Sequence, residues 1–145
     1  MRIQGKRVWI AGQFMAAQME IEDGVISRIH EYGAGPADED YGDKRIVPGF
    51  IDIHRHADAA VFRPDFGQLE LHQGLTTIVN GNCGLSLAPV SPAHKAEILG
   101  YMSPITGRVP SHIETATMDG YLEQVGRQPL PINVGMLVGG GTLRA

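Results

Sequence analysis

The stretch Val47-Pro48-Gly49-Phe50-Ile51-Asp52-Ile53-His54-Arg55-His56 carries most of the information on the fold. Pro48-Gly49 favours a turn, and the mostly apolar segment 50–53 after it predicts a short, buried β-strand that ends at two histidines. Side chains alternate in a strand, so we expect His54 and His56 on the same side, with Cβ atoms about two rises of ~3.3 Å apart. Two imidazoles at that spacing can reach one metal ion.

A pair of histidines is only part of a metal site. A catalytic zinc site needs about three protein ligands plus a water, with the imidazole nitrogens roughly 2.0–2.1 Å from the ion. Asp52 and Asp58 flank the pair, and carboxylates so placed can orient ligating rings. Judged on the two histidines alone, ordinary hydrogen-bonded histidines at a strand end are an open alternative.

The order of turn, strand and histidine pair in 48–56 resembles the first barrel strand of the amidohydrolase superfamily. Members of that superfamily are metal-dependent hydrolases built on a (β/α)8 barrel. The resemblance implies that His54 and His56 bind the catalytic metal at the carboxyl end of this strand.

A second motif follows a predicted strand at 75–80, which is rich in β-branched residues. Cys83 lies between Asn82 and Gly84 just past that strand, and a thiolate binds zinc at roughly 2.3 Å. A lone buried cysteine is more often a small hydrophobic residue. However, the segment 74–89, with Gly-Asn-Cys-Gly at 81–84, resembles the second strand of the N-acyl-D-amino-acid deacylases, the D-aminoacylase branch of the superfamily. That resemblance implies that Cys83 is a metal ligand.

The same branch is similar to this chain at 133–134 and at 137–144, with one departure. Gly140 stands where the family usually has histidine, and a glycine has no side chain with which to bind metal or substrate. The resemblance implies zinc-dependent hydrolysis of an N-acyl-D-amino acid to a D-amino acid and a carboxylate. The family's general base and its remaining histidine ligands come from later strands, so they are expected downstream of Ala145.

The chain has 145 residues, whereas a complete (β/α)8 barrel takes about 250. We therefore expect an α/β fold that is the N-terminal portion of a longer protein, with the barrel incomplete. Residues 1–46 are expected to form a small antiparallel β-sandwich segment with a hairpin turn at Asp23-Gly24. Residues 47–145 are expected to form the first three βα units of the barrel.

Local signals predict the remaining elements. A short helix is expected at 65–73, with Gly74 just beyond it, and a third strand at 132–138. Ser91-Pro92 predicts the start of a helix that reaches about residue 100, and Thr117 predicts the cap of another at 118–125. The segments 31–43 and 104–111 are expected to be irregular, and Gly139-Gly140-Gly141 is expected to turn the chain away from the third strand.

Charge and composition exclude several classes of partner. Twelve Lys and Arg stand against 16 Asp and Glu, a net charge of −4 without a basic stripe, so nucleic acid is not an expected partner. There is no apolar run of about 18 residues and no leader peptide pattern, so we expect no membrane span and a cytoplasmic location. The single cysteine cannot form an intrachain disulfide. The expected partner is a small N-acyl amino acid, with self-association if the open sheet edge is uncovered.

Two other kinds of function remain open. The same barrel could act on a cyclic amide or an acetylated sugar, although the Gly-Asn-Cys-Gly setting of Cys83 argues against both. The chain could also be a non-catalytic half-barrel module. Arg55 is expected to point away from the site into an ion pair, and three histidines are expected outside the site: His30, His72 and His94. For His112, in an irregular polar segment, a contact with substrate is left open.

Overall fold

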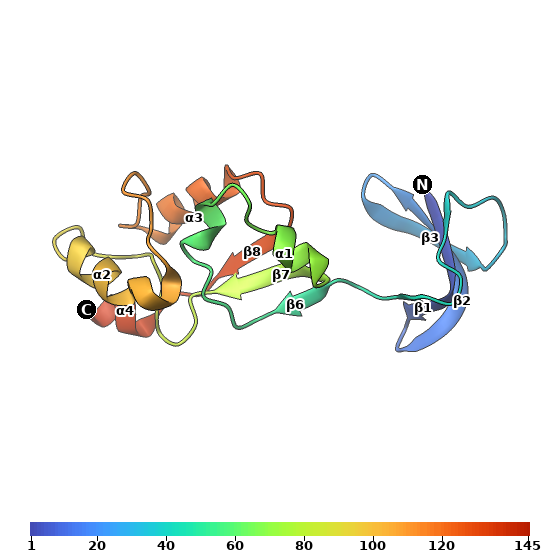
Figure 1. The fold of residues 1–145 in the computed structure, drawn as a ribbon, viewed down its shortest axis with the longest axis horizontal. Helices are drawn as coiled ribbons and strands as arrows, with labels where there is room; N and C mark the ends of the chain where they lie inside the picture. The colour runs from blue at the N-terminus through green and yellow to red at the C-terminus, as the bar shows by residue number, and fades with distance from the viewer. The chain divides into compact units, whose positions relative to one another are not determined.

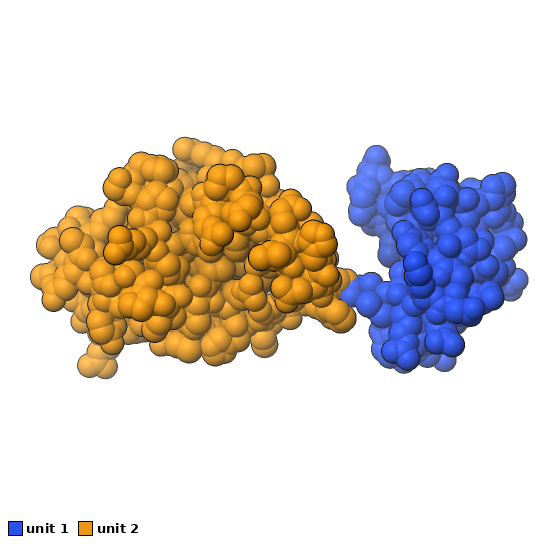
Figure 2. Space-filling model, viewed as in Figure 1, with its two compact units in different colours: residues 1–48 blue, residues 49–145 orange.

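The computed structural model describes residues 1–145, which fall into two units, Met1–Pro48 and Gly49–Ala145 (Figures 1 and 2). The first unit is a sheet built on an antiparallel meander of β1 (Arg2–Ile10), β2 (Gln13–Glu22) and β3 (Val25–Glu31). Asp23 and Gly24 both have positive φ in the turn between β2 and β3. The predicted antiparallel strands and hairpin turn are therefore confirmed.

Two short strands complete the sheet of the first unit. β4 (Glu39–Asp40) and β5 (Arg45–Ile46) each pair in parallel with β1, so the five-stranded sheet is mixed. The prediction that 31–43 is entirely loop is wrong at β4, because its backbone pairing depends on a partner strand that is distant in sequence. A small core of Val8, Ala17 and Met19 lies against this sheet.

The second unit is an α/β unit with a three-stranded parallel sheet. Its strands are β6 (Phe50–Asp52), β7 (Leu75–Asn80) and β8 (Asn133–Met136), and β7 lies between the other two (Figure 1). The predicted strand–helix–strand connections and parallel order are confirmed. Closure of these strands into a (β/α)8 barrel, and a second layer that would make the first unit a sandwich, remain predictions.

Helical segments join the strands of the second unit. These are η1 (Ala60–Phe62), α1 (Gln68–His72), α2 (Lys95–Thr106), α3 (Met118–Gly126) and α4 (Gly140–Arg144). The main core packs α2 and α3 against the segment after β7, and its fully buried large side chains include Val61, Leu87, Met102 and Tyr121. None of the helices is both long and apolar enough to cross a membrane.

The prediction that the first barrel strand is buried is wrong for this chain. Phe50, Ile51 and Ile53 are 58%, 62% and 71% exposed. The physical reason is that β6 is an edge strand whose only partner is β7. The strand also ends at Asp52, so the two histidines lie in the bend beyond it rather than on the strand itself.

Helix α2 differs from its prediction at both ends. It begins at Lys95 because Ser91–His94 closes a separate turn, in which the His94 amide donates to the Ser91 carbonyl over 3.1 Å. It also continues past Gly100 and includes Pro104. Proline cannot donate to the carbonyl four residues earlier, but the Ser103 hydroxyl donates to that Gly100 carbonyl at 2.9 Å and satisfies it.

Helix α4 corrects a third expectation. The glycines 139–141 do not simply turn the chain away from β8, because Gly140 and Gly141 already belong to a short helix. By contrast, β7 spans the predicted residues, and α3 begins at Met118 after the predicted Thr117 cap, whose side chain accepts a hydrogen bond from the Gly120 amide.

Candidate metal centre

Three potential metal ligands meet at the carboxyl ends of β6 and β7. His54 and His56 follow β6, Cys83 follows β7, and one ligand atom from each lies within 4.8 Å of the others. His54 Nε2 and Cys83 Sγ lie 3.3 Å apart. The two imidazole rings stand nearly perpendicular, at 75°, with centroids 5.7 Å apart.

The chemistry and spacing of these donors fit a transition metal. Bond lengths of about 2.0 Å to nitrogen and 2.3 Å to sulfur put two ligands of a tetrahedral zinc roughly 3.5 Å apart. The 3.3 Å between His54 and Cys83 is close to that value. Nδ1 of His56 is buried and has no hydrogen-bond partner. His54 and Cys83 are exposed, so the cluster has an open side.

Backbone hydrogen bonds to β7 hold the histidine bend in place. The Arg55 amide donates to the Val79 carbonyl at 3.1 Å, and the Ala57 amide donates to Oδ1 of Asn80 at 2.9 Å. Asn80 is fully buried at the end of β7. The peptide units 54–55 and 56–57 are thus tied to the neighbouring strand, even though they lie outside the sheet.

Arg55, between the two histidines, forms the ion pair that its position predicted. Its guanidinium lies 2.7 Å from a carboxylate oxygen of the largely buried Glu70 on α1 and 3.4 Å from Asp52. Asp52 accepts the backbone amide of His54 at 3.1 Å rather than a ring nitrogen. The expectation that Asp52 orients a ring is therefore wrong, because the carboxylate is turned towards the backbone and Arg55.

Asp58 is fully buried and was not predicted to be so. Burial raises its pKa to about 6, and the amides of Asp58 and Gly81, which approach without full hydrogen-bond geometry, offset that effect only in part. The Tyr121 hydroxyl donates to the Asp58 backbone carbonyl at 2.7 Å. No ring nitrogen pairs with the Asp58 carboxylate, so this residue does not orient the histidines either.

The turn that carries Cys83 is tightly constrained. Cys83 has φ +56°, a left-handed backbone conformation that is unusual for a residue other than glycine. Gly81 packs so closely on the segment after β8 that a Cβ there would collide with the Leu137 carbonyl. The side-chain amide of Asn82 donates to the carbonyls of Val79, at 2.8 Å, and Arg55, at 3.3 Å. Sequence reasoning missed this role, although an asparagine directly after a glycine in a tight turn was a usable signal.

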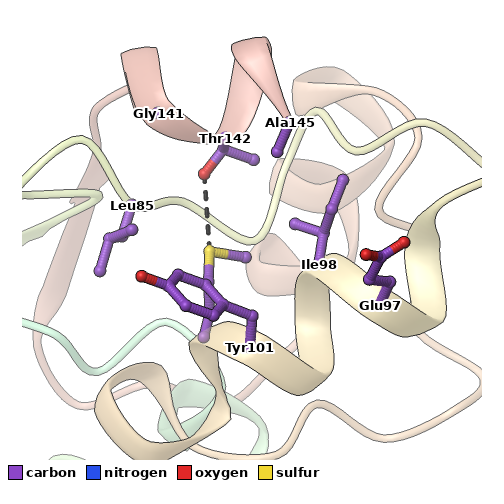
Figure 3. A pocket seen from close by; sticks show the side chains of 8 residues that line it. Leu85, Glu97, Ile98, Tyr101, Gly141, Thr142 and Ala145 are labelled. Carbon is purple, nitrogen blue, oxygen red and sulfur yellow. Dashed lines mark hydrogen bonds between the residues drawn. The ribbon is translucent and has the colours of Figure 1, made fainter.

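The other histidines lie outside the cluster. His94 and His112 are exposed, the His72 ring contacts the Gln68 carbonyl within α1, and His30 lies 3.5 Å from Glu20. A separate, mostly apolar pocket of about 420 Å³ lies between α2 and α4 (Figure 3). The hydroxyl of Thr142 meets the Met102 sulfur in its wall. This pocket has no histidine or cysteine in its lining and is distinct from the cluster.

Parallel strands with histidine and cysteine side chains gathered at their carboxyl ends define an α/β protein whose strand ends carry donors of the kind that transition metals prefer. No known family model matches the chain. However, an N-acyl-D-glutamate deacylase from Alcaligenes xylosoxydans xylosoxydans is 35% identical over 138 residues, which cover 93% of this chain and 27% of that protein. By sequence and by fold, the chain belongs with the N-acyl-D-amino-acid deacylases of the amidohydrolase family.

Solved structures agree with this family relationship. The N-acyl-D-glutamate deacylase of Bordetella bronchiseptica, complexed with zinc and a phosphonate that mimics the tetrahedral reaction intermediate, is 31% identical with a TM-score of 0.72. A D-aminoacylase studied for its binuclear metal centre is 28% identical, also with a TM-score of 0.72. Each match covers 99% of this chain and 30% of the other, so the chain spans less than a third of its relatives' length.

Proposed function

We propose that His54, His56 and Cys83 hold a zinc ion in a deacylase that hydrolyses N-acyl-D-amino acids to D-amino acids and carboxylates. The convergence of the three ligand atoms within 4.8 Å is the observation that carries this proposal. The substrate class is supported by the related deacylases for acidic N-acyl-D-amino acids. The metal is supported by the zinc complex of the Bordetella relative.

In this proposal the chain contributes the first part of the active site. When bound, zinc lowers the pKa of a coordinated water towards 7 and polarises the scissile carbonyl. The two imidazoles and the thiolate fix the position of the ion, and their exposed side leaves room for substrate. The general base and any further ligands lie on the remaining part of the proposed barrel, since the chain spans only 30% of its structural relatives.

A cyclic amidase or sugar deacetylase is the competing enzyme, and a non-catalytic half-barrel is the competing module. The cysteine donor and the named deacylases favour hydrolysis of a linear amide over both enzyme alternatives. The exposed β6 edge is the one feature that favours the module, because an uncovered parallel strand is available for association.

Metal analysis of the whole protein tests the ligand set. We expect zinc in the purified wild type, and a substantial loss of zinc in Cys83→Ala and His54→Ala. His72→Ala is the matched control, because His72 is exposed and lies outside the cluster. Unchanged zinc in the first two variants, or equal loss in the control, would contradict the site. Hydrolysis of N-acetyl-D-amino acids in preference to their L-isomers is expected, and activity only on cyclic amides would overturn the substrate assignment.

A further inference from the structure

We infer that Asn82 is a positioning residue that sets the location of Cys83 relative to His54 and His56 by joining the two strand ends through one side-chain amide. This inference rests on the proposed metal site and names a residue that is not itself a ligand. It concerns how the donors are held when no ion is present to hold them.

The hydrogen bonds of Asn82 form a closed circuit between the two strand ends. Its Nδ2 group donates one bond to the Val79 carbonyl at 2.8 Å and another to the Arg55 carbonyl at 3.3 Å. The Arg55 amide donates a hydrogen bond to the same Val79 carbonyl at 3.1 Å. Both hydrogens of the amide group are therefore used, and the peptide between the two histidines is fixed to the end of β7.

No other residue joins these two segments in the same way. Apart from Asn82, the turn 81–84 has a single side-chain hydrogen bond to the segment 54–56, namely the contact between Cys83 Sγ and His54 Nε2. That contact is between the proposed ligands themselves. Asn80 binds Ala57, but it belongs to the strand rather than to the cysteine turn. The connection outside the ligands therefore depends on Asn82.

The conformation of the turn explains why an anchor is needed. Gly81, Cys83 and Gly84 all have positive φ, so the backbone around the cysteine is in a conformation that is unfavourable for cysteine and lacks side-chain support at the glycines. Without Asn82, the thiol would no longer be tied to the backbone that carries the histidines. Groups that orient metal ligands from outside typically contribute 10–100-fold to metal affinity.

Cobalt(II) titration of the whole metal-free protein tests the inference, because thiolate-to-cobalt charge transfer reports directly on Cys83. We expect Asn82→Ala to bind cobalt about 10–100-fold more weakly and to show a shifted or weakened charge-transfer band. Asn82→Leu keeps the branched shape without donors, so it is expected to behave in the same way. If one of the two variants fails to fold, the other still tests the bond.

Asn133→Ala is the matched control. Asn133 also donates from Nδ2 to a backbone carbonyl of β7, that of Thr76 at 3.1 Å, but it lies at the opposite end of the strand. We expect its cobalt affinity and spectrum to match the wild type even if its melting temperature falls. Wild-type affinity and spectrum in the Asn82 variants would overturn the inference alone. The absence of a thiolate band in the wild type would instead overturn the proposed site.

Discussion

At the scale of single residues, the cysteine turn combines a useful side chain with an unfavourable backbone. An L-residue in the left-handed region costs roughly 1–2 kcal/mol relative to the right-handed helical region. Cys83 adopts this conformation at φ +56°, directly before Gly84 at φ +74°. Such strain persists only where the surrounding structure determines it, and it is common at functional sites.

Replacement of Cys83 separates strain from metal binding. Both Cys83→Gly and Cys83→Ala remove the thiolate and should abolish the thiolate-to-cobalt band. In the metal-free protein, however, Cys83→Gly should be more stable than Cys83→Ala by up to about 1 kcal/mol. The reason is that glycine adopts a positive φ without the steric cost that alanine, which has a Cβ, still carries. Chemical denaturation of the two metal-free variants measures the difference. Equal stability, or a more stable alanine variant, would show that the turn is not strained.

Glu20 gives the first unit a predictable pH dependence. Hydrogen bonds from Arg2 and then His30 lower the Glu20 pKa below its ordinary value of 4.5. A carboxyl whose pKa is lowered by folding contributes stability above its unfolded pKa and loses that contribution as pH falls through the folded pKa. We therefore expect Glu20→Gln to be less stable than wild type at pH 7, with the difference shrinking below about pH 4.5.

The matched control for Glu20 is Glu22→Gln. Glu22 is an exposed acid at the end of the same strand and has no ion-pair partner in the structure. Thermal melts of the wild type and both variants from pH 7 to pH 3 make the comparison. A difference for Glu20→Gln that grows on acidification would give the opposite sign and contradict the assigned shift.

At the scale of secondary-structure elements, α3 depends on a local cap. The Thr117 hydroxyl accepts the Gly120 amide at 3.1 Å, which satisfies one of the free amides in the first turn. Thr117→Ala should destabilise the protein by about 1 kcal/mol. Thr117→Ser keeps the hydroxyl and should stay within a few tenths of a kcal/mol. Urea denaturation compares them, and equal losses in both variants would show that the methyl group matters rather than the cap.

Local signals of this kind explain which elements could be predicted from the sequence. β7 has a run of β-branched residues, and α3 has its cap and terminal glycine, so both were predicted closely. The burial of β6 depends on what lies beside it, which a local apolar run does not specify. The extension of α2 through Pro104 depends on the side chain of Ser103 replacing a lost backbone donor.

The candidate site shows the same division. The motifs around His54, His56 and Cys83 indicated which residues to bring together, and the structure places them within 4.8 Å of one another. The residues that hold these three side chains in place, without being ligands themselves, could not be predicted from those motifs. Asn82 acts on a carbonyl 27 residues earlier in the chain, so its role appears only once the strands are adjacent.

Neighbouring glycines at the start of α4 differ sharply in how much space surrounds them. A Cβ at Gly139 would collide with the Gly84 carbonyl, whereas one at Gly140 would meet nothing within 4 Å. Gly139→Ala should therefore cost about 1–3 kcal/mol through forced displacement of the cysteine turn. Gly140→Ala should change stability by less than about 1 kcal/mol. Denaturation curves test the contrast, and equal effects would contradict the close packing of Gly139 against the cysteine turn at Gly84.

At the scale of the whole molecule, the chain leaves an apolar strand edge uncovered. β6 has a partner on one side only, and the apolar side chains on it and just after it are largely exposed: Phe50 58%, Ile51 62% and Ile53 71%. An edge with free backbone groups and exposed apolar side chains favours pairing with another chain. The extra length of the related deacylases would supply cover for this edge if the proposed barrel closes.

These features predict that residues 1–145, expressed alone, self-associate in a concentration-dependent way. Ile51→Lys, on β6, together with Ile53→Lys, directly after it, should shift the population towards monomer, because charge at an edge strand opposes pairing. Tyr101→Lys is the control: Tyr101 is 80% exposed, but it lies on helix α2, whose backbone groups are already paired. Sedimentation velocity over a range of concentrations measures the distribution. A monomeric wild-type segment, or an equal shift with Tyr101→Lys, would show that the β6 edge does not drive association.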